Sequence, residues 1–123
     1  MIYTSSYSLA SKYLSPINTV FIRISTSMPA WWNKPYEAFP AVYPGWDLVN
    51  GIKEGRLTEE EYTRAYLYKL SYVDLESIKN KVREWELQGK DVCFMCYCGV
   101  GKFCHRHLLL KAMGLNYVEF KGY

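Results

Sequence analysis

The residues best suited to chemistry gather in one short segment of the sequence, between Cys96 and His107. This segment holds three of the four cysteines and both histidines of the 123-residue chain. The apolar run at residues 92–96 leads into it, which is typical of a strand buried on both faces of a parallel sheet. A glycine-containing stretch follows, and then a leucine-rich one that begins at Leu108. The segment therefore predicts a strand, a loop and the N-terminus of a helix.

The start of this predicted helix concentrates positive charge. Lys102, His105 and Arg106 lie at or just before its first turn. Cationic side chains oppose the helix dipole at this end, at a cost of about 0.3–1 kcal/mol, and local conflicts of this kind are expected at functional sites. Free N–H groups at a helix N-terminus favour an anion, so an anionic ligand would resolve the conflict. Its expected contacts are Lys102, Arg106 and the backbone amides of Gly99 and Gly101.

Two residues of this segment are candidates for catalysis. A thiol at a helix N-terminus beside a histidine and an arginine should have a lowered pKa, which makes Cys104 the candidate nucleophile. His105 is the candidate acid-base group. For Cys93 and Cys98, an ordinary role as structural thiols is as well supported as a functional one. The sequence leaves open whether the protein is an enzyme.

Two familiar phosphate-binding loops are excluded by the spacing. A Walker P-loop has a glycine, then four residues of any type, then Gly-Lys followed by Ser or Thr. Here Gly101-Lys102 is followed by Phe103, and Cys96 stands where the first glycine would be. A cysteine phosphatase or rhodanese loop places an arginine or similar donor five or six residues after the nucleophile. Six residues after Cys96 is Lys102, and six after Cys98 is Cys104.

A zinc site is the main alternative use of the same residues. Thiolates and imidazoles are the ligands that zinc prefers, and Cys96, Cys98 and Cys104 could combine with His107 or with His105. The spacing lacks the usual knuckle of two to four residues, however, and the two histidines point to different sides of a helix. The sequence requires no cofactor, and a zinc ion is compatible with it.

The overall composition is that of a mildly basic chain. Lys and Arg outnumber Asp and Glu by 15 to 12, without the dense basic stripe of a dedicated nucleic-acid binder. An anionic partner is therefore permitted, a nucleic acid included. No long uncharged apolar run exists, so no membrane partner is expected. The start of the chain lacks the features of a secretory signal, and reduced, clustered thiols are typical of the cytoplasm, where we expect the protein.

Strand and helix signals alternate along the chain, which predicts the α/β class. We expect a single three-layer domain over residues 1–123, with a mostly parallel sheet of about four strands flanked by helices. Residues 28–55, rich in prolines and aromatic residues, predict one long loop that could act as a lid. A capping box, Thr58 with Glu61, opens one helix, and Asp74 opens another. The strands are expected at residues 1–4, 20–24, 92–96 and 116–120.

The remaining candidate contacts follow from this architecture. Ligands of open parallel sheets bind beyond the carboxyl ends of the strands. Tyr62 and Tyr66 share one helix face, and such a face more often packs into a core than binds a ligand. A tryptophan pair such as that at 31–32 more often packs a loop onto the core than stacks on a base. The expected ligand-binding set is completed by Cys96, Ser5, Tyr7, Arg23, Ser25, Trp32, Tyr62 and Tyr66.

The chain resembles the domain-of-unknown-function 488 (DUF488) family. The likeness lies in the opening residues 2–6, in residues 23–25 with the Pro29 and Trp32 that follow, and above all in residues 92–109, where Cys96 precedes a Cys-His-Arg signature and a leucine-rich helix. Family members commonly have an acidic residue where this chain has Cys98. The resemblance implies a compact α/β fold and a bacterial or phage origin, and it supplies no activity.

Three hypotheses about function stay open from the sequence. The first is a pocket that binds a nucleotide or another phosphorylated or anionic molecule, and that also processes it if Cys104 and His105 are catalytic. The second is a metal site of Cys96, Cys98, Cys104 and His107. The third is an interaction module for protein or nucleic acid, without catalysis, that uses the aromatic residues 31–46.

Overall fold

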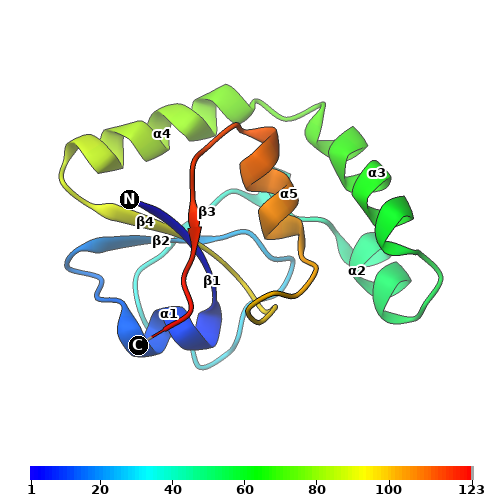
Figure 1. The fold of residues 1–123 in the computed structure, drawn as a ribbon, viewed down its shortest axis with the longest axis horizontal. Coiled ribbons are helices and arrows are strands. Elements are labelled where there is room, and N and C mark those ends of the chain that lie inside the picture. The colour runs from blue at the N-terminus through cyan, green and yellow to red at the C-terminus, as the bar shows by residue number, and fades with distance from the viewer. Residues whose placement is uncertain (123) are drawn as a thin grey trace.

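The computed structural model describes residues 1–122 as a five-stranded, wholly parallel sheet with helices on both faces (Figure 1). The strand order is β3-β2-β4-β1-β5. This confirms the predicted α/β class and parallel sheet, with five strands rather than about four. The elements are β1 (Ile2–Ser6), α1 (Tyr7–Tyr13), β2 (Thr19–Arg23), β3 (Glu37–Ala38), the 3-10 turn η1 (Pro40–Val42), α2 (Trp46–Lys53), α3 (Glu59–Leu70), α4 (Leu75–Leu87), β4 (Asp91–Cys96), α5 (His105–Ala112) and β5 (Val118–Glu119).

Strand β4 lies at the centre of the sheet and aligns the ends of its neighbours. It pairs with β1 on one side, where Ser6 lies opposite Cys96, and with β2 on the other, where Arg23 lies opposite Met95. Because all three strands are parallel, their carboxyl ends meet at one edge of the sheet. The segments that follow β1, β2 and β4 are therefore neighbours in space.

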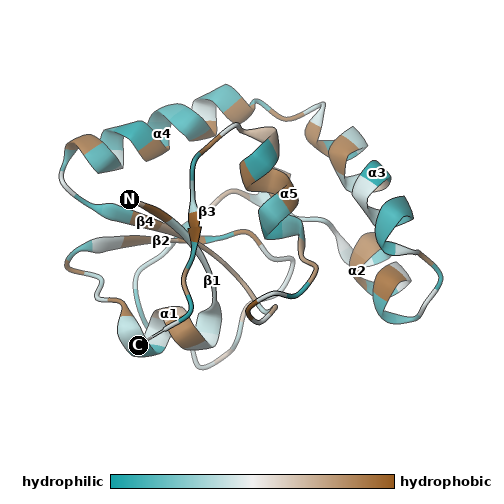
Figure 2. Ribbon diagram, in the orientation of Figure 1, coloured by the Kyte–Doolittle hydropathy of each residue, from teal (hydrophilic) through white to brown (hydrophobic). Residues whose placement is uncertain are grey.

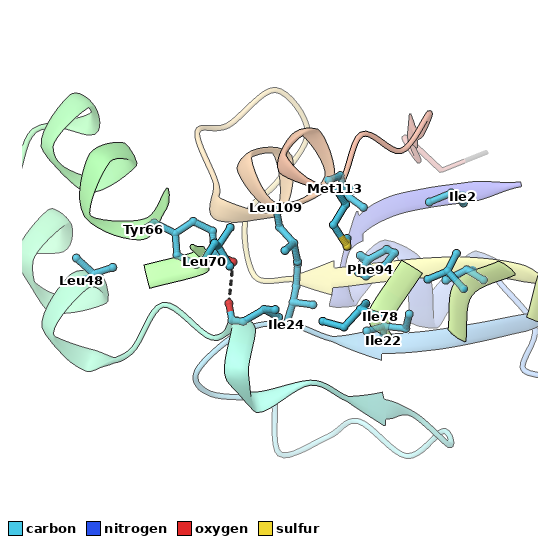
Figure 3. Packing of buried hydrophobic residues seen from close by; sticks show 14 of the residues in the cluster. Ile2, Ile22, Ile24, Leu48, Tyr66, Leu70, Ile78, Phe94, Leu109 and Met113 are labelled. Atoms are coloured by element: carbon cyan, nitrogen blue, oxygen red, sulfur yellow. Dashed lines mark hydrogen bonds between the residues drawn. The ribbon is translucent and has the colours of Figure 1, made fainter. Parts of the chain in front are cut away.

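The two faces of the sheet carry two separate cores. Side chains alternate along a strand, so Phe94 of β4 packs on one face and Met95 on the other. The larger core lies under α3, α4 and α5, and Figure 3 shows Phe94 there beside Ile22 and Met113. The smaller core lies under α1 and includes Tyr7. Helix α4 is mostly hydrophilic along the surface seen in Figure 2.

The predicted helix boundaries on the second half of the chain are found in the structure. The Thr58 hydroxyl accepts a hydrogen bond from the Glu61 amide (3.1 Å), and the Glu61 carboxylate accepts one from the Thr58 amide (3.0 Å). Asp74 caps α4, and Gly89 follows its end with a φ of 82°. The left-handed backbone conformation at this position favours glycine.

No helix of residues 1–122 combines the length and apolar character that crossing a bilayer needs.

The structure differs from the sequence expectation in two places. Residues 28–55, expected as one long loop, contain β3, η1 and helix α2, which buries Leu48 against its surroundings. The four prolines of this stretch hide α2, because they interrupt the periodicity before it starts at Trp46. Helix α1 was not predicted either. Its Ser6 cap accepts a hydrogen bond from the Leu9 amide, but only two of its seven residues are buried, so its pattern is weak.

The capping box of α3 gives a direct test of this fold. Thr58→Ala removes the hydroxyl that accepts the Glu61 amide and should lower the free energy of unfolding by about 1 kcal/mol. Thr63→Ala, in the interior of the same helix, serves as the control and should change stability by less than about 0.5 kcal/mol. Urea denaturation measures both. Equal effects of the two substitutions would show that the cap does not stabilise α3.

Candidate functional site

A cavity of about 470 Å³ opens at the carboxyl ends of β2 and β4. Its walls come from the loop after β2, from α2, from the start of α3, and from the segment between β4 and α5. This volume is in the usual range for small-molecule pockets, about 300–1,000 Å³. Cys96 and Cys104 are buried, whereas Lys53 and Lys102 are exposed, so the thiols lie at the inner end and the lysines near the mouth.

Three thiols meet in this cavity and form what we call the cysteine cluster: Cys96, Cys98 and Cys104. Their sulfur atoms all lie within 4.8 Å of one another, and those of Cys96 and Cys104 are 2.7 Å apart. The Cys98 amide also donates to the Cys96 sulfur (3.4 Å). All three are free thiols, so nothing covalent holds the cluster together.

Arg106 holds the loop that carries the cluster. Its side chain is fully buried, and one terminal nitrogen donates to the Cys96 sulfur (3.0 Å) and to the Cys98 carbonyl (2.7 Å). The other donates to the Gly99 carbonyl (3.0 Å) and to the Glu119 carboxylate (2.6 Å). The positive charge at the start of α5 is therefore neutralised within the protein. Arg106 was expected to contact a ligand, but the structure directs both terminal nitrogens to the chain itself.

The electrostatics of the cluster differ from the sequence expectation. The pKa of Cys96 is lowered, because its thiolate accepts hydrogen bonds from Cys104 and Cys98 and faces the Arg106 guanidinium. The pKa of Cys104 is raised, because its interactions with the Cys96 and Cys98 sulfurs and its burial favour the protonated thiol. The expected lowered pKa of Cys104 was therefore wrong. The helix start was correctly located, but the arginine beside Cys104 in sequence reaches back to Cys96.

The ring of His105 is fixed by a backbone carbonyl. Its Nε2 lies 2.7 Å from the Ile24 carbonyl, which can only accept, so Nε2 carries the hydrogen. Burial lowers the pKa of His105 and favours the neutral ring, which leaves Nδ1 as an acceptor. This Nδ1 lies 3.7 Å from the Cys104 sulfur. Cys104 can therefore donate its proton either to Cys96 or to His105.

His107 lies apart from the cysteine cluster. Its Nδ1 hydrogen bonds with the Tyr117 hydroxyl (3.0 Å), and its Nε2 is 3.8 Å from the Glu119 carboxylate. Residues two positions apart point about 200° from each other on an α-helix, so His105 and His107 cannot both face the sheet. The structure thus brings Cys96, Cys98 and Cys104 together without His107.

Several other residues that were expected to contact a ligand make hydrogen bonds within the protein instead. The Tyr66 hydroxyl donates to the Val42 carbonyl (2.7 Å), as Figure 3 shows, and Tyr66 is buried. The hydroxyls of Tyr7 and Ser25 hydrogen bond to each other inside the protein. Of the expected set, Cys96, Tyr62, Lys102, Cys104 and His105 line the cavity, whereas Ser5, Tyr7, Arg23, Ser25, Trp32, Tyr66, Gly99, Gly101 and Arg106 are not part of its lining.

Arg23 and Trp32 illustrate how such residues are used instead. Arg23 donates to the Thr26 carbonyl (2.8 Å) and so shapes the loop that borders the cavity. Trp32 packs edge-on against Phe21, with ring centroids 5.2 Å apart, in the smaller core. Its neighbour Trp31 is half exposed.

Sequence reasoning missed three charged contributors to the site. Lys53 lines the cavity from α2, a helix that was not predicted. Glu59, at the start of α3, was taken only as part of a helix start. Glu119 accepts from Arg106 and from the Gly101 amide (3.1 Å), and no sequence signal links a residue of the last strand to this loop.

Comparison with known families agrees with the resemblance seen in the sequence. Residues 23–116 match the family model DUF488-N3a, whose description reads "Active DUF488-N3 subclade". The chain belongs to the DUF488 family. The matched range runs from the last residue of β2 past the end of α5 and includes the cysteine cluster, His105 and Arg106. No curated protein and no solved structure matches the chain.

The ion pair of Arg106 and Glu119 predicts a pH dependence of stability. Burial raises the pKa of Glu119, but the Gly101 amide and the Arg106 guanidinium lower it more, so the folded-state pKa lies below the usual value. A depressed carboxyl pKa stabilises the folded protein above the unfolded pKa of about 4.3 and loses this effect as the pH falls through the folded value. Glu119→Gln should therefore cost about 1–2 kcal/mol at pH 7, and the difference from the unmodified protein should shrink below about pH 4.

Urea denaturation at several pH values measures this dependence. Glu76→Gln is the matched control, because Glu76 pairs with Lys79 on the exposed surface of α4 and should have little effect at any pH. A cost of Glu119→Gln that stayed constant down to pH 3 would contradict the ion-pair interpretation.

Proposed function

We propose that this DUF488 protein binds a nucleotide or a similar small phosphorylated molecule in the cavity and processes it at the cysteine cluster. The observation that carries the proposal is the cavity itself, in which an aromatic wall, two lysines and three thiols face one space. Its place beyond the carboxyl ends of parallel strands is where α/β proteins bind ligands.

The wall of the cavity suits a flat, largely apolar group. Tyr62 of α3 and Phe103 pack edge-to-face, with ring centroids 5.5 Å apart. Val49 and Ile52 of α2 add aliphatic surface. Aromatic and aliphatic side chains of this kind stack on rings, which supports a base or another planar group as part of the ligand.

The mouth of the cavity suits an anion. Lys53 and Lys102 line it with a single acidic residue, Glu59, so its charged side chains sum to one positive charge. Because both terminal nitrogens of Arg106 are bonded within the protein, the lysines supply the charge that a phosphate needs.

The inner end of the cavity supplies the reactive groups. Cys96 and Cys104 are buried thiols that line it, and His105 lies beside them as a neutral acceptor. Thiols and imidazoles are the usual nucleophilic and acid-base groups of enzymes. The description of the matched subclade as active is in keeping with a chemical role.

Thermal unfolding in the presence of nucleotides tests the binding step. AMP or ADP at about a hundred times its Kd should stabilise the protein by about 2.7 kcal/mol, while adenosine should have much less effect because it lacks the phosphate. Lys102→Ala should weaken binding about tenfold, since hydrogen bonds to charged groups contribute about 1.5–3 kcal/mol. Lys111→Ala, on the exposed last turn of α5, is the matched control and should bind normally.

A broad panel of nucleotides and sugar phosphates extends this experiment. The proposal is wrong if no member of the panel raises the unfolding temperature, or if the two lysine variants bind equally well.

A further inference from the structure

The cysteine cluster has the composition and spacing of a metal site. Zinc binds thiolates at about 2.3 Å, so two sulfurs on one tetrahedral zinc lie about 3.8 Å apart. The sulfurs of Cys96, Cys98 and Cys104 all lie within 4.8 Å of one another, at both ends of one short loop. The pair of Cys96 and Cys104, now 2.7 Å apart, would separate by about 1 Å to share an ion.

We propose that Cys96, Cys98 and Cys104 bind one zinc ion whose fourth coordination position faces the cavity. The inference rests on the proposed function only for the ligand that would occupy the cavity, and the metal site stands on the geometry of the cluster alone. With zinc bound, the three thiols would act together as one reactive centre rather than as separate groups.

The surroundings of the cluster already provide donors to sulfur. Cys96 accepts from the Arg106 guanidinium (3.0 Å) and from the Cys98 amide (3.4 Å). Such hydrogen bonds orient metal ligands and tune their basicity. Three thiolates and one zinc ion carry a net charge of minus one, which faces the buried Arg106 guanidinium while that group also pairs with Glu119. Buried charges are tolerated when they are paired and hydrogen bonded, and the sulfur of Cys96 has both kinds of partner.

The number of protein ligands indicates the kind of zinc site. Structural sites have four protein ligands, whereas catalytic sites have three and keep a position for water or substrate. His105 lies 3.7 Å from the Cys104 sulfur, beside the three-sulfur group rather than within it. All three cysteines line the cavity, so a metal ion held by them would be reached from it. Zinc lowers the pKa of a bound water to about 7, so the fourth position would hold a reactive water or an atom of the ligand.

Metal analysis of the intact protein tests the inference. The chain is purified under reducing conditions without chelator, its free thiols are counted, and zinc is measured by elemental analysis. We expect one equivalent of zinc, and after exchange for Co²⁺ we expect the absorption of a thiolate-coordinated cobalt ion. Cys98→Ser should lose the zinc and the cobalt signal. Cys98 is only partly buried, and its contacts with Cys96 and Arg106 include backbone atoms that the substitution leaves in place.

Cys93→Ala is the matched control. Cys93 is a free thiol three residues before Cys96, but it packs in the smaller core on the other face of the sheet. This variant should retain the metal, and circular dichroism of both variants shows whether they fold. The inference is overturned if the fully reduced, unmodified protein binds less than about a tenth of an equivalent of zinc, or if Cys98→Ser binds it as well as Cys93→Ala does.

The same preparations separate this inference from the proposed function. Zinc in the protein without any nucleotide-induced stabilisation would leave the metal site standing and reject the nucleotide ligand. Nucleotide binding by a reduced protein that takes up no zinc would keep the proposed function and reject the metal site.

Discussion

The burial of the Arg106 guanidinium is the constraint on which the rest of this site depends. A buried cation is tolerated only when it is paired and hydrogen bonded, and Arg106 finds its partners in a thiol, two carbonyls and the Glu119 carboxylate. These partners belong to β4, to the loop after it and to β5. One side chain therefore joins the central strand, the loop and an edge strand, and it determines where the sulfur of Cys96 lies.

The register of the sheet supplies the other half of the site. Because β2 and β4 are parallel neighbours, the backbone beyond Arg23 passes close to the end of β4, and the Ile24 carbonyl meets the ring of His105. This contact fixes which nitrogen of His105 carries the hydrogen and turns the other toward Cys104. Neither strand would be correctly placed for this without the buried contacts of Ile22 and Phe94 in the larger core.

Local signals in the sequence were enough for most of the fold, and for the position of the site along the chain. The apolar run of β4 and the caps at Thr58 and Asp74 each depend on neighbouring residues, which sequence patterns record well. The partners of Arg106 depend instead on which side of α5 faces the sheet. A rotation of the helix by one residue would exchange the surroundings of its side chains. For the same reason, the choice between His105 and His107 could not be made before the fold was known, and Glu119 could not be connected to the site.

The distribution of charge in the cavity has a consequence for how a ligand would lie in it. The Arg106 guanidinium, which supports the inner end of the cavity, is already shared among protein groups. A phosphate at this end would therefore meet sulfur atoms and the neutral imidazole of His105. The exposed amines of Lys53 and Lys102 lie toward the mouth. Under the proposed function, the phosphate therefore stays at the mouth, and the uncharged part of the ligand extends inward to the sulfur atoms. The bond that reacts would then lie in that uncharged part rather than at the phosphorus atom.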